Sequence, residues 1–244
     1  MNLNIMKTIK GRKSARTIFL RLGLIFLLGT LVVRCDLNDD SVSGDFDSGL
    51  WGSFGLVHRD SSRVDSDFSI SLDNGAILFP QNAGSYNMAD SARVFVSYNV
   101  LDSTDTGNSK QYDVMIYQIQ NVLFKTIAEL TAANADSIGD DPINVEKYWK
   151  VNNIITFELS FWGNSATHFI NLVRSPADTA REGQPILLEL KHNANDDLQM
   201  YQMSAWVSFN LSSLKVAGQD SVSYTLTARQ YDGTTYEKKD VFRY

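Results

Sequence analysis

The chain has 244 residues, and 43% of them are hydrophobic, enough for one large domain or two small ones with buried cores. Seven of the 22 basic residues precede Cys35, whereas none of the 28 acidic residues does. The chain after Cys35 therefore carries 15 basic against 28 acidic residues, a net charge of −13. Such a surface repels phosphate backbones, so we expect no nucleic-acid partner.

The N-terminal residues 1–34 have the pattern of an export signal. The first 21 residues are basic and polar, and Leu22–Val33 is an apolar run, shorter than the roughly 20 residues that span a membrane. Arg34, in place of the usual small residue, and then Cys35, the single cysteine, follow the run. This resembles a bacterial lipoprotein signal, which implies that Cys35 is lipidated. An uncleaved membrane anchor is the alternative.

Residues 35–48 are acidic, contain Ser and Gly, and lack core-forming side chains, so we expect a flexible tether. Asp39 and Asp40 resemble the acidic surface-export signal of Bacteroidetes lipoproteins. A calcium site is the alternative, but the segment has no Asp-x-Asp-x-Asp-Gly loop. The expected location is the cell envelope, lipid-anchored at the outer membrane, on the periplasmic face or at the cell surface.

A first domain is predicted over residues 49–131, built from short strands. Phe68–Leu72 and Ala76–Phe79 flank Asp73-Asn74-Gly75, a strong hairpin signal. Arg93–Leu101 and Gln111–Tyr117 alternate between apolar and other residues. About five strands in about 80 residues favour a small closed barrel of the oligonucleotide/oligosaccharide-binding (OB) type.

A second domain is predicted over residues 142–244, after a small and acidic segment, Ala132–Asp141, in which we place the junction. Tight turns are expected at Asn152-Asn153 and Asp232-Gly233. About seven strands in about 100 residues favour a β-sandwich. The predicted fold class is all-β: an OB-like barrel and then a β-sandwich, after a lipoprotein signal.

Histidines are the first candidates for chemistry. His58 belongs to the first predicted domain, and His168 and His192 stand at the ends of strands in the second. The latter two could face each other across one edge of the sandwich. They could then form a metal pair or, as we predict, be hydrogen-bonded structural residues. No metal and no cofactor is expected.

Aromatic residues could form a stacking platform for a sugar or a partner. Trp206 and Trp162 are the main candidates, with Trp51, Tyr86 and Trp149 as further members. Trp206 lies on the face of its strand opposite the apolar one, so it is either a ligand contact or part of a strand buried on both sides.

Catalysis has little support in the sequence. Glu158 and Glu189 could act as paired carboxylates, but both occupy polar faces of apolar strands, which is typical of solvent-exposed charge. No Gly-x-Ser-x-Gly motif is present. We predict no catalytic residues and no enzyme.

Three stretches resemble the NigD-like lipoprotein family of Bacteroidetes: residues 92–127 without the polar loop 103–110, Gly139–Val173 and Leu188–Leu214. The resemblance implies an N-terminal OB-type barrel and a C-terminal β-sandwich. The family name comes from an association with a bacteriocin locus, which implies an immunity role. It supplies no reaction, ligand or catalytic residue.

The predicted function is that of an envelope lipoprotein that acts by binding, in an immunity-like role. The alternative is a carbohydrate- or peptide-binding surface lipoprotein of an uptake or adhesion system, and a hydrolase is third. The expected partners are the membrane, through the lipid anchor, and an unknown protein or glycan.

Overall fold

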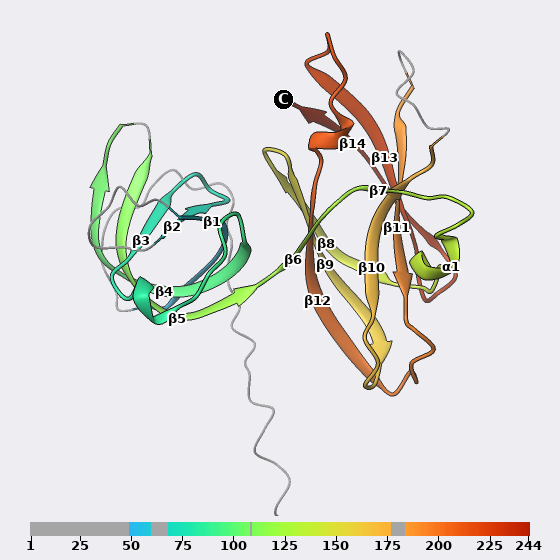
Figure 1. Cartoon of the computed structure of the whole chain (residues 1–244), viewed down its shortest axis with the longest axis horizontal. Helices are drawn as coiled ribbons and strands as arrows, with labels where there is room; N and C mark the ends of the chain where they lie inside the picture. Colours follow the sequence, from blue (N-terminus) through green and yellow to red (C-terminus); the bar gives the residue numbers. More distant parts are fainter. Residues whose placement is uncertain (1–48, 60–67, 108, 177–183) are drawn as a thin grey trace, which may run out of the picture. The chain divides into compact units, whose positions relative to one another are not determined.

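The computed structural model describes residues 49–59, 68–107, 109–176 and 184–244 (Figure 1). The expected signal peptide, the tether, Cys35, Asp39 and Asp40 lie outside these residues. Within the described ranges, no helix has both the length and the hydropathy needed to cross a membrane. Phe46–Tyr244 forms one compact unit.

The first part of this unit is a closed five-stranded barrel in the order β1-β2-β3-β5-β4 (Figure 1). The turn Asp73-Asn74-Gly75 joins β2 to β3 as predicted, because Gly75 adopts φ +86° and the side chain of Asn74 accepts the N–H of Ala76. Alternate residues of β4 and β5 fill the barrel, among them Val94, Val96 and Val114. The strands are β1 (Trp51–His58), β2 (Ser69–Leu72), β3 (Ile77–Pro80), β4 (Arg93–Asp105) and β5 (Lys110–Asn121).

The second part is a sandwich of two sheets. The four-stranded sheet has the order β6-β12-β9-β8, with β6 (Leu123–Thr126), β12 (Tyr201–Asn210), β9 (Ile154–Gly163) and β8 (Asn144–Val151). The five-stranded sheet has the order β14-β13-β11-β10-β7, with β14 (Thr235–Arg243), β13 (Ser221–Arg229), β11 (Ile186–Asn193), β10 (Phe169–Arg174) and β7 (Ala128–Glu129). A helical turn, α1 (Ala135–Ile138), precedes β8.

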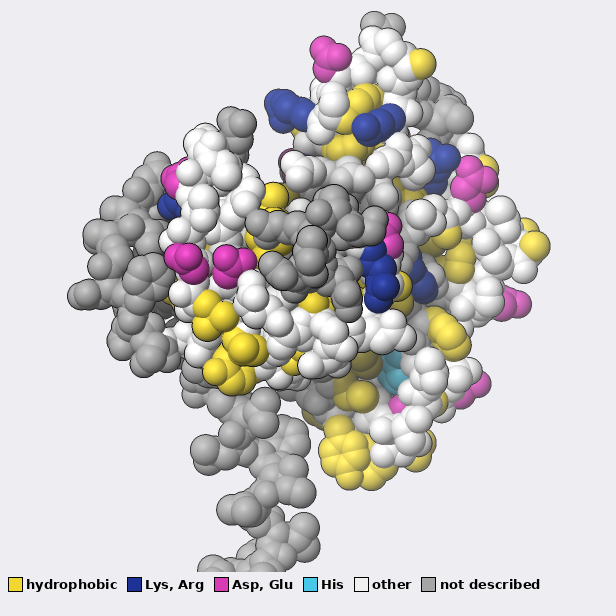
Figure 2. Space-filling model, turned by 60° about the vertical axis from the view of Figure 1, so that its left-hand side comes forward, with side chains coloured by type: hydrophobic (Ala, Val, Ile, Leu, Met, Phe, Trp, Pro, Cys, Tyr) yellow, Lys and Arg dark blue, Asp and Glu magenta, His cyan; other side chains and the backbone are white. Residues whose placement is uncertain are grey.

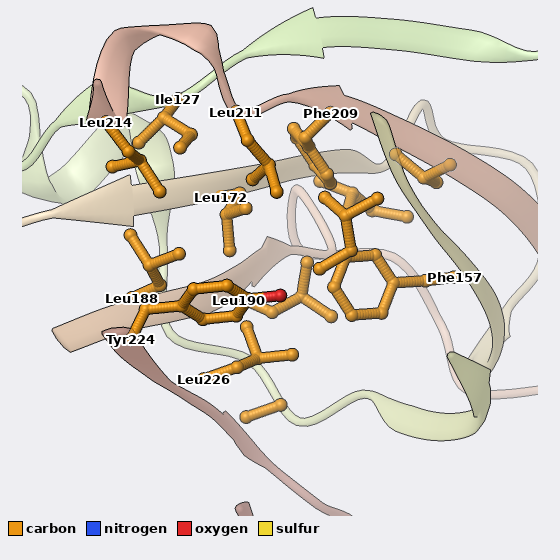
Figure 3. Close-up of a cluster of buried hydrophobic side chains, with 14 of the residues drawn as sticks. Ile127, Phe157, Leu172, Leu188, Leu190, Phe209, Leu211, Leu214, Tyr224 and Leu226 are labelled. Carbon is orange, nitrogen blue, oxygen red and sulfur yellow. The ribbon is translucent and has the colours of Figure 1, made fainter. Parts of the chain in front are cut away.

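The sandwich core lies between the two sheets (Figure 3). Phe157 of β9 and Phe209 of β12 pack edge to face, with ring centroids 6.1 Å apart. Leucines of β10, β11 and β13 meet them from the other sheet. β11 and β13 bury apolar side chains at alternate positions, which is the period of two that the sequence displays. The predicted all-β class, with a barrel followed by a sandwich, is confirmed.

The junction differs from the predicted one at residues 132–141. The barrel ends with β5 at Asn121, whereas β6 and β7 pair with β12 and β10 and so belong to the sandwich. The segment 132–141 contains α1 and leads from β7 to β8 inside the sandwich. The small and acidic composition of this segment is that of an exposed connection. The strands 123–126 and 128–129 are too short to be recognised in the sequence as separate elements.

Barrel and sandwich share a polar and aromatic contact within the compact unit. The buried guanidinium of Arg93, at the start of β4, bonds both carboxylate oxygens of Asp73 and donates to Thr156 and Ser208 of the sandwich. Trp206 packs against Phe54 and Phe95 of the barrel, with ring centroids 5.1 and 4.9 Å away, and Trp149 also contacts Phe54. The four bonds of Arg93 satisfy a charge that burial would otherwise penalise.

The edge strands β8 and β14 are joined by polar side chains. The carboxylate of Asp240 accepts hydrogen bonds from the hydroxyls of Tyr148 and Tyr224 and from the ammonium of Lys150. Burial alone would raise the pKa of Asp240, but the bonds from Lys150 and Tyr148 lower it to about 2. We call these four residues the polar clasp.

Candidate functional site at the open end of the sandwich

Two histidines and an aspartate form a hydrogen-bonded row at one end of the sandwich. Nδ1 of His168 lies 2.8 Å from Nε2 of His192, and Nε2 of His168 lies 3.1 Å from Oδ2 of Asp197. Nδ1 of His192 lies 3.0 Å from the carbonyl oxygen of Pro142. The two imidazoles are stacked with centroids 5.0 Å apart, and both contact Phe161 of the core.

The polar atoms of the row are linked in one chain of contacts. The carbonyl of Pro142 only accepts a hydrogen bond, so Nδ1 of His192 donates to it. The ring of His168 connects His192 to the carboxylate of Asp197 through its two nitrogens.

The surroundings favour an ionised Asp197 and a neutral His192. Backbone N–H groups of Asn164 and Ser165, together with His168, hold the pKa of Asp197 far below its usual range. Burial lowers the pKa of His192, against the opposing effect of its bond to Pro142. Through these contacts the row links the loop before β10 to the loop after β11.

The described residues around the row provide no group placed to hold a metal ion and no hydroxyl bonded to an imidazole. Over the described ranges, no group of three or more His, Cys, Asp or Glu side chains is placed to hold a metal ion. No hydroxyl group of a described residue is bonded to either imidazole. The arrangement therefore resembles a structural brace more than a metal centre or a catalytic triad.

An apolar rim surrounds this end. Leu198 and Tyr201 are 64% and 60% exposed, and Met203, on the inward face of β12, is still 40% exposed. Figure 2 shows exposed hydrophobic side chains gathered toward the bottom of the view, close to histidine. We define the apolar rim as the exposed hydrophobic residues of this end, Trp162, Phe169, Leu198, Met200, Tyr201 and Met203.

The apolar rim and the row both border Gly163. A Cβ atom at Gly163 would stand 2.8 Å from Nε2 of His168 and 2.9 Å from the sulfur of Met203. Gly163 pairs with Tyr201 across the β9–β12 ladder, and Met203 pairs with Phe161. The absence of a side chain at position 163 thus lets the histidine row and the rim approach each other.

The other aromatic candidates do not converge on one platform. Trp149 and Trp206 pack against the barrel, so Trp206 is half-buried in that contact and is not part of an exposed platform. Trp51 is exposed on β1, and the hydroxyl of Tyr86 donates to the carbonyl of Ile116 inside the barrel region. Trp162 is the member of the predicted set that lies in the rim.

The two candidate carboxylates lie in different sheets and each has a lysine partner. Glu158 is 3.0 Å from Lys147, and Glu189 is 2.9 Å from Lys191. Both glutamates are half-buried and held in these ion pairs, and they do not face each other as a catalytic pair would. His58 lies at the exposed end of β1, in the barrel and not in the row.

Sequence reasoning did not single out Asp197 or the exposure of Tyr201 and Met203. Alternation placed Tyr201 and Met203 on the same face as the buried Val207 and Phe209, and the structure keeps that face but leaves its first half uncovered. The signal available in the sequence was the uncharged apolar run from Leu198 to Met203, which a strand end in solvent would not ordinarily carry.

The fold and the sandwich end define a two-part β protein without an evident reaction centre among its described residues. The family model of the NigD-like N-terminal OB domain matches residues 58–122, and that of the NigD-like C-terminal beta sandwich domain matches residues 126–242. The chain therefore belongs to the NigD-like family, as its resemblance predicted. Both matched ranges agree with a change from barrel to sandwich between β5 and β6.

Solved structures share this architecture. A protein described as toxin-related, from Parabacteroides distasonis, is 27% identical with a TM-score of 0.64, over 79% of this chain and 93% of that one. A protein of unknown function from Bacteroides vulgatus is 20% identical, with a TM-score of 0.63 over 80% and 91% of the two chains. A NigD-like immunity protein from Bacteroides caccae is 17% identical, with a TM-score of 0.56 over 78% and 91%. No curated protein matches the chain.

Proposed function

We propose that this chain is an envelope lipoprotein that acts by binding another protein through the apolar rim. The observation that carries the proposal is the exposure of six large hydrophobic side chains at one end of the sandwich. An exposed apolar group held on a rigid brace is a feature of interaction sites in soluble domains. The brace here is the row formed by His168, His192 and Asp197.

The proposed role is immunity-like. One solved structure with this fold is described as a NigD-like immunity protein, and another, from Bacteroides fragilis, is described as a lipoprotein. A protein tethered at the envelope by Cys35 is concentrated where an incoming toxin arrives. Its net charge of −13 after Cys35 steers a cationic toxin toward it, and occlusion of the toxin follows from binding.

The experiment is deletion of the gene, followed by challenge with bacteriocins of neighbouring strains. We expect greater sensitivity to at least one of them, restored by the native gene and not by a Tyr201→Lys/Met203→Lys variant. The control is a Ser213→Lys/Ser223→Lys variant, which adds the same charge at exposed positions at the opposite end of the sandwich, after β12 and near the start of β13. Unaltered sensitivity together with a growth defect on one glycan would contradict immunity and favour the carbohydrate-binding alternative.

The anchor is tested separately. Cys35→Ala should abolish incorporation of a labelled fatty acid and move the protein out of the detergent phase, because Cys35 is the single thiol of the chain. Unchanged partitioning would point instead to an uncleaved apolar segment, Leu22–Val33, as the anchor.

A further inference from the structure

The strand β12 is paired on both sides over only part of its length. It pairs with β9 from Tyr201 to Asn210, whereas β6 covers only Val207–Asn210 on the other side. The first half, Tyr201–Trp206, therefore has an open edge within the part of the chain that the structure describes. Tyr201, Gln202, Met203 and Ser204 are all exposed, so solvent reaches this edge.

The open edge presents backbone groups that can form a further ladder. The N–H of Leu211 donates to the carbonyl of Asn153 at 2.8 Å, one step beyond the Asn210–Ile154 pair. Because the residues of an antiparallel strand alternate between bonding the partner and turning away from it, this bond places the N–H groups of Gln202, Ser204 and Trp206 on the open side. No hydrogen bond to these groups is formed by the described residues.

The side chains of this segment do not oppose pairing with another strand. Leu198–Trp206 contains no charged residue and no proline, which are the usual guards of an exposed strand. The neighbouring edge of β10 differs, because the ammonium of Lys125 donates to the carbonyl of Ile170 and to the side chain of Asn171. The unguarded ladder is therefore confined to the first half of β12.

We propose that the first half of β12 receives an extended segment of a partner protein as an additional strand of the four-stranded sheet. This rests on the proposed function and specifies how the apolar rim binds. Backbone hydrogen bonds to the open edge supply affinity, and alternate side chains of the added strand supply specificity. Those on the side of Tyr201 and Met203 are apolar, and those on the side of Gln202 and Ser204 are small and uncharged.

Charge decides between a foreign strand and a second copy of this chain. Two copies joined edge to edge would each bring a net charge of −13 after Cys35 and repel each other. A foreign segment flanked by basic residues is attracted by the same charge. The occupant that fits is therefore an extended, uncharged and partly apolar segment with lysines or arginines beside it.

The test uses the full chain in detergent and a synthetic peptide of alternating threonine and valine with lysines at both ends. We expect binding with a dissociation constant below about 1 mM and slower amide hydrogen exchange at Gln202, Ser204 and Trp206. The same peptide with N-methylated alternate residues should not bind, because it lacks the donors of a strand. The same peptide with glutamates at its ends should bind more weakly.

Substitutions in the chain complete the test. Tyr201→Lys/Met203→Lys should weaken peptide binding at least about tenfold, whereas the matched control Ser213→Lys/Ser223→Lys should not. Ser204→Pro removes one N–H from the open side without removing a bond to β9, so it should also weaken binding while the melting temperature stays close to that of the native chain.

Three results would overturn strand addition. Binding that is sensitive to Tyr201→Lys/Met203→Lys but leaves exchange at Gln202–Trp206 unchanged would retain the rim as a binding site and reject the added strand. Protection of the same amides in a dimer without peptide would replace the partner with a second copy. No binding by the peptide, despite a bacteriocin phenotype on gene deletion, would reject the edge and keep the proposed function.

Discussion

The sandwich has one edge formed by β8 and β14 and an opposite edge at which β6 and β7 cover only the ends of β12 and β10. On the first edge, Glu237, Lys238, Lys239 and Asp240 lie in succession along β14. On the second, the uncovered half of β12 carries Tyr201 and Met203 and no charge. One edge of the sandwich therefore carries charged side chains that oppose pairing with another strand, and the open part of β12 at the opposite edge carries none.

The two edges differ in what an incoming strand would meet. Charged side chains and the polar clasp prevent pairing at β8 and β14 because an incoming strand would have to desolvate them. At β12 no such cost exists, so an added strand gains hydrogen bonds and apolar contact together. The histidine row keeps this unguarded end ordered, since it joins the loop before β10 to that after β11.

The largest expected change in stability is at the edge formed by β8 and β14. Asp240→Ala removes the acceptor shared by Tyr148, Tyr224 and Lys150, and leaves a partly buried ammonium without its partner. We expect the free energy of unfolding, measured with urea, to fall by about 2 kcal/mol. Lys239→Ala is the control: its pair with Glu237 is exposed, so its loss should cost under about 0.5 kcal/mol. Equal effects of the two variants would show that the clasp adds nothing to this edge.

A smaller effect is expected where the row meets the rim. Gly163→Ala places a Cβ against His168 and Met203 and forces one of them to move. Overpacking costs about 1 kcal/mol at the lower end of its usual range, which we expect here because the atoms met are the ends of side chains that can shift, and urea unfolding would measure it. Gln202→Ala, an exposed substitution on the adjoining strand, is the control and should be close to neutral. If Gly163→Ala leaves the free energy of unfolding unchanged, the side chains of the apolar rim can move aside without cost, and the row does not hold them in place.

The pH dependence of stability tests the contribution of the histidine row. Because burial lowers the pKa of His192 below its unfolded value of 6.5, the unfolded chain binds more protons as the pH falls. The melting temperature should therefore fall between pH 7 and pH 5, and the slope should be smaller in His192→Gln. His58→Gln, at an exposed histidine of the barrel, should keep the native slope. The lowered pKa of Asp197 adds a second loss below about pH 4.

The smallest effect on stability is expected at the open edge of β12. Tyr201→Ser and Met203→Ser remove apolar side chains that are largely exposed, so each should change the free energy of unfolding by under about 0.5 kcal/mol. Binding of a hydrophobic dye to the folded chain should nevertheless decrease, because the rim loses apolar surface. A loss of stability comparable to that of Asp240→Ala would mean that these residues belong to the core and not to a binding surface.

Local sequence patterns predict much of the fold. The hairpin turns at Asn74-Gly75 and Asn152-Asn153 require positive φ, which Gly75 and Asn152 adopt, and the sequence marked both. The alternation of β12 assigned its inward face correctly. The junction was less readable, since β6 and β7 are short and their pairing with β12 and β10 spans a long stretch of chain.

The candidate site was readable only in part. The two histidines could be expected near each other because both stand at strand ends, and the structure places them 2.8 Å apart. Asp197 could not be assigned to them, since acidic residues are frequent in the chain and its role depends on a loop after β11. Trp206 had two possible environments, and the barrel contact selected one of them.

The sequence by itself determined the strands, their turns and the face on which each apolar side chain lies, because these follow from a period of two residues and from local φ preferences. Only the tertiary structure decided which inward positions are covered. Val207 and Phe209 lie in the core between the two sheets and have the parallel strand Leu123–Thr126 paired beside them. That strand begins only opposite Val207, so it does not extend beside Tyr201 and Met203, which are exposed. This depends on where a strand about 80 residues earlier in the chain begins, which no local pattern in β12 encodes.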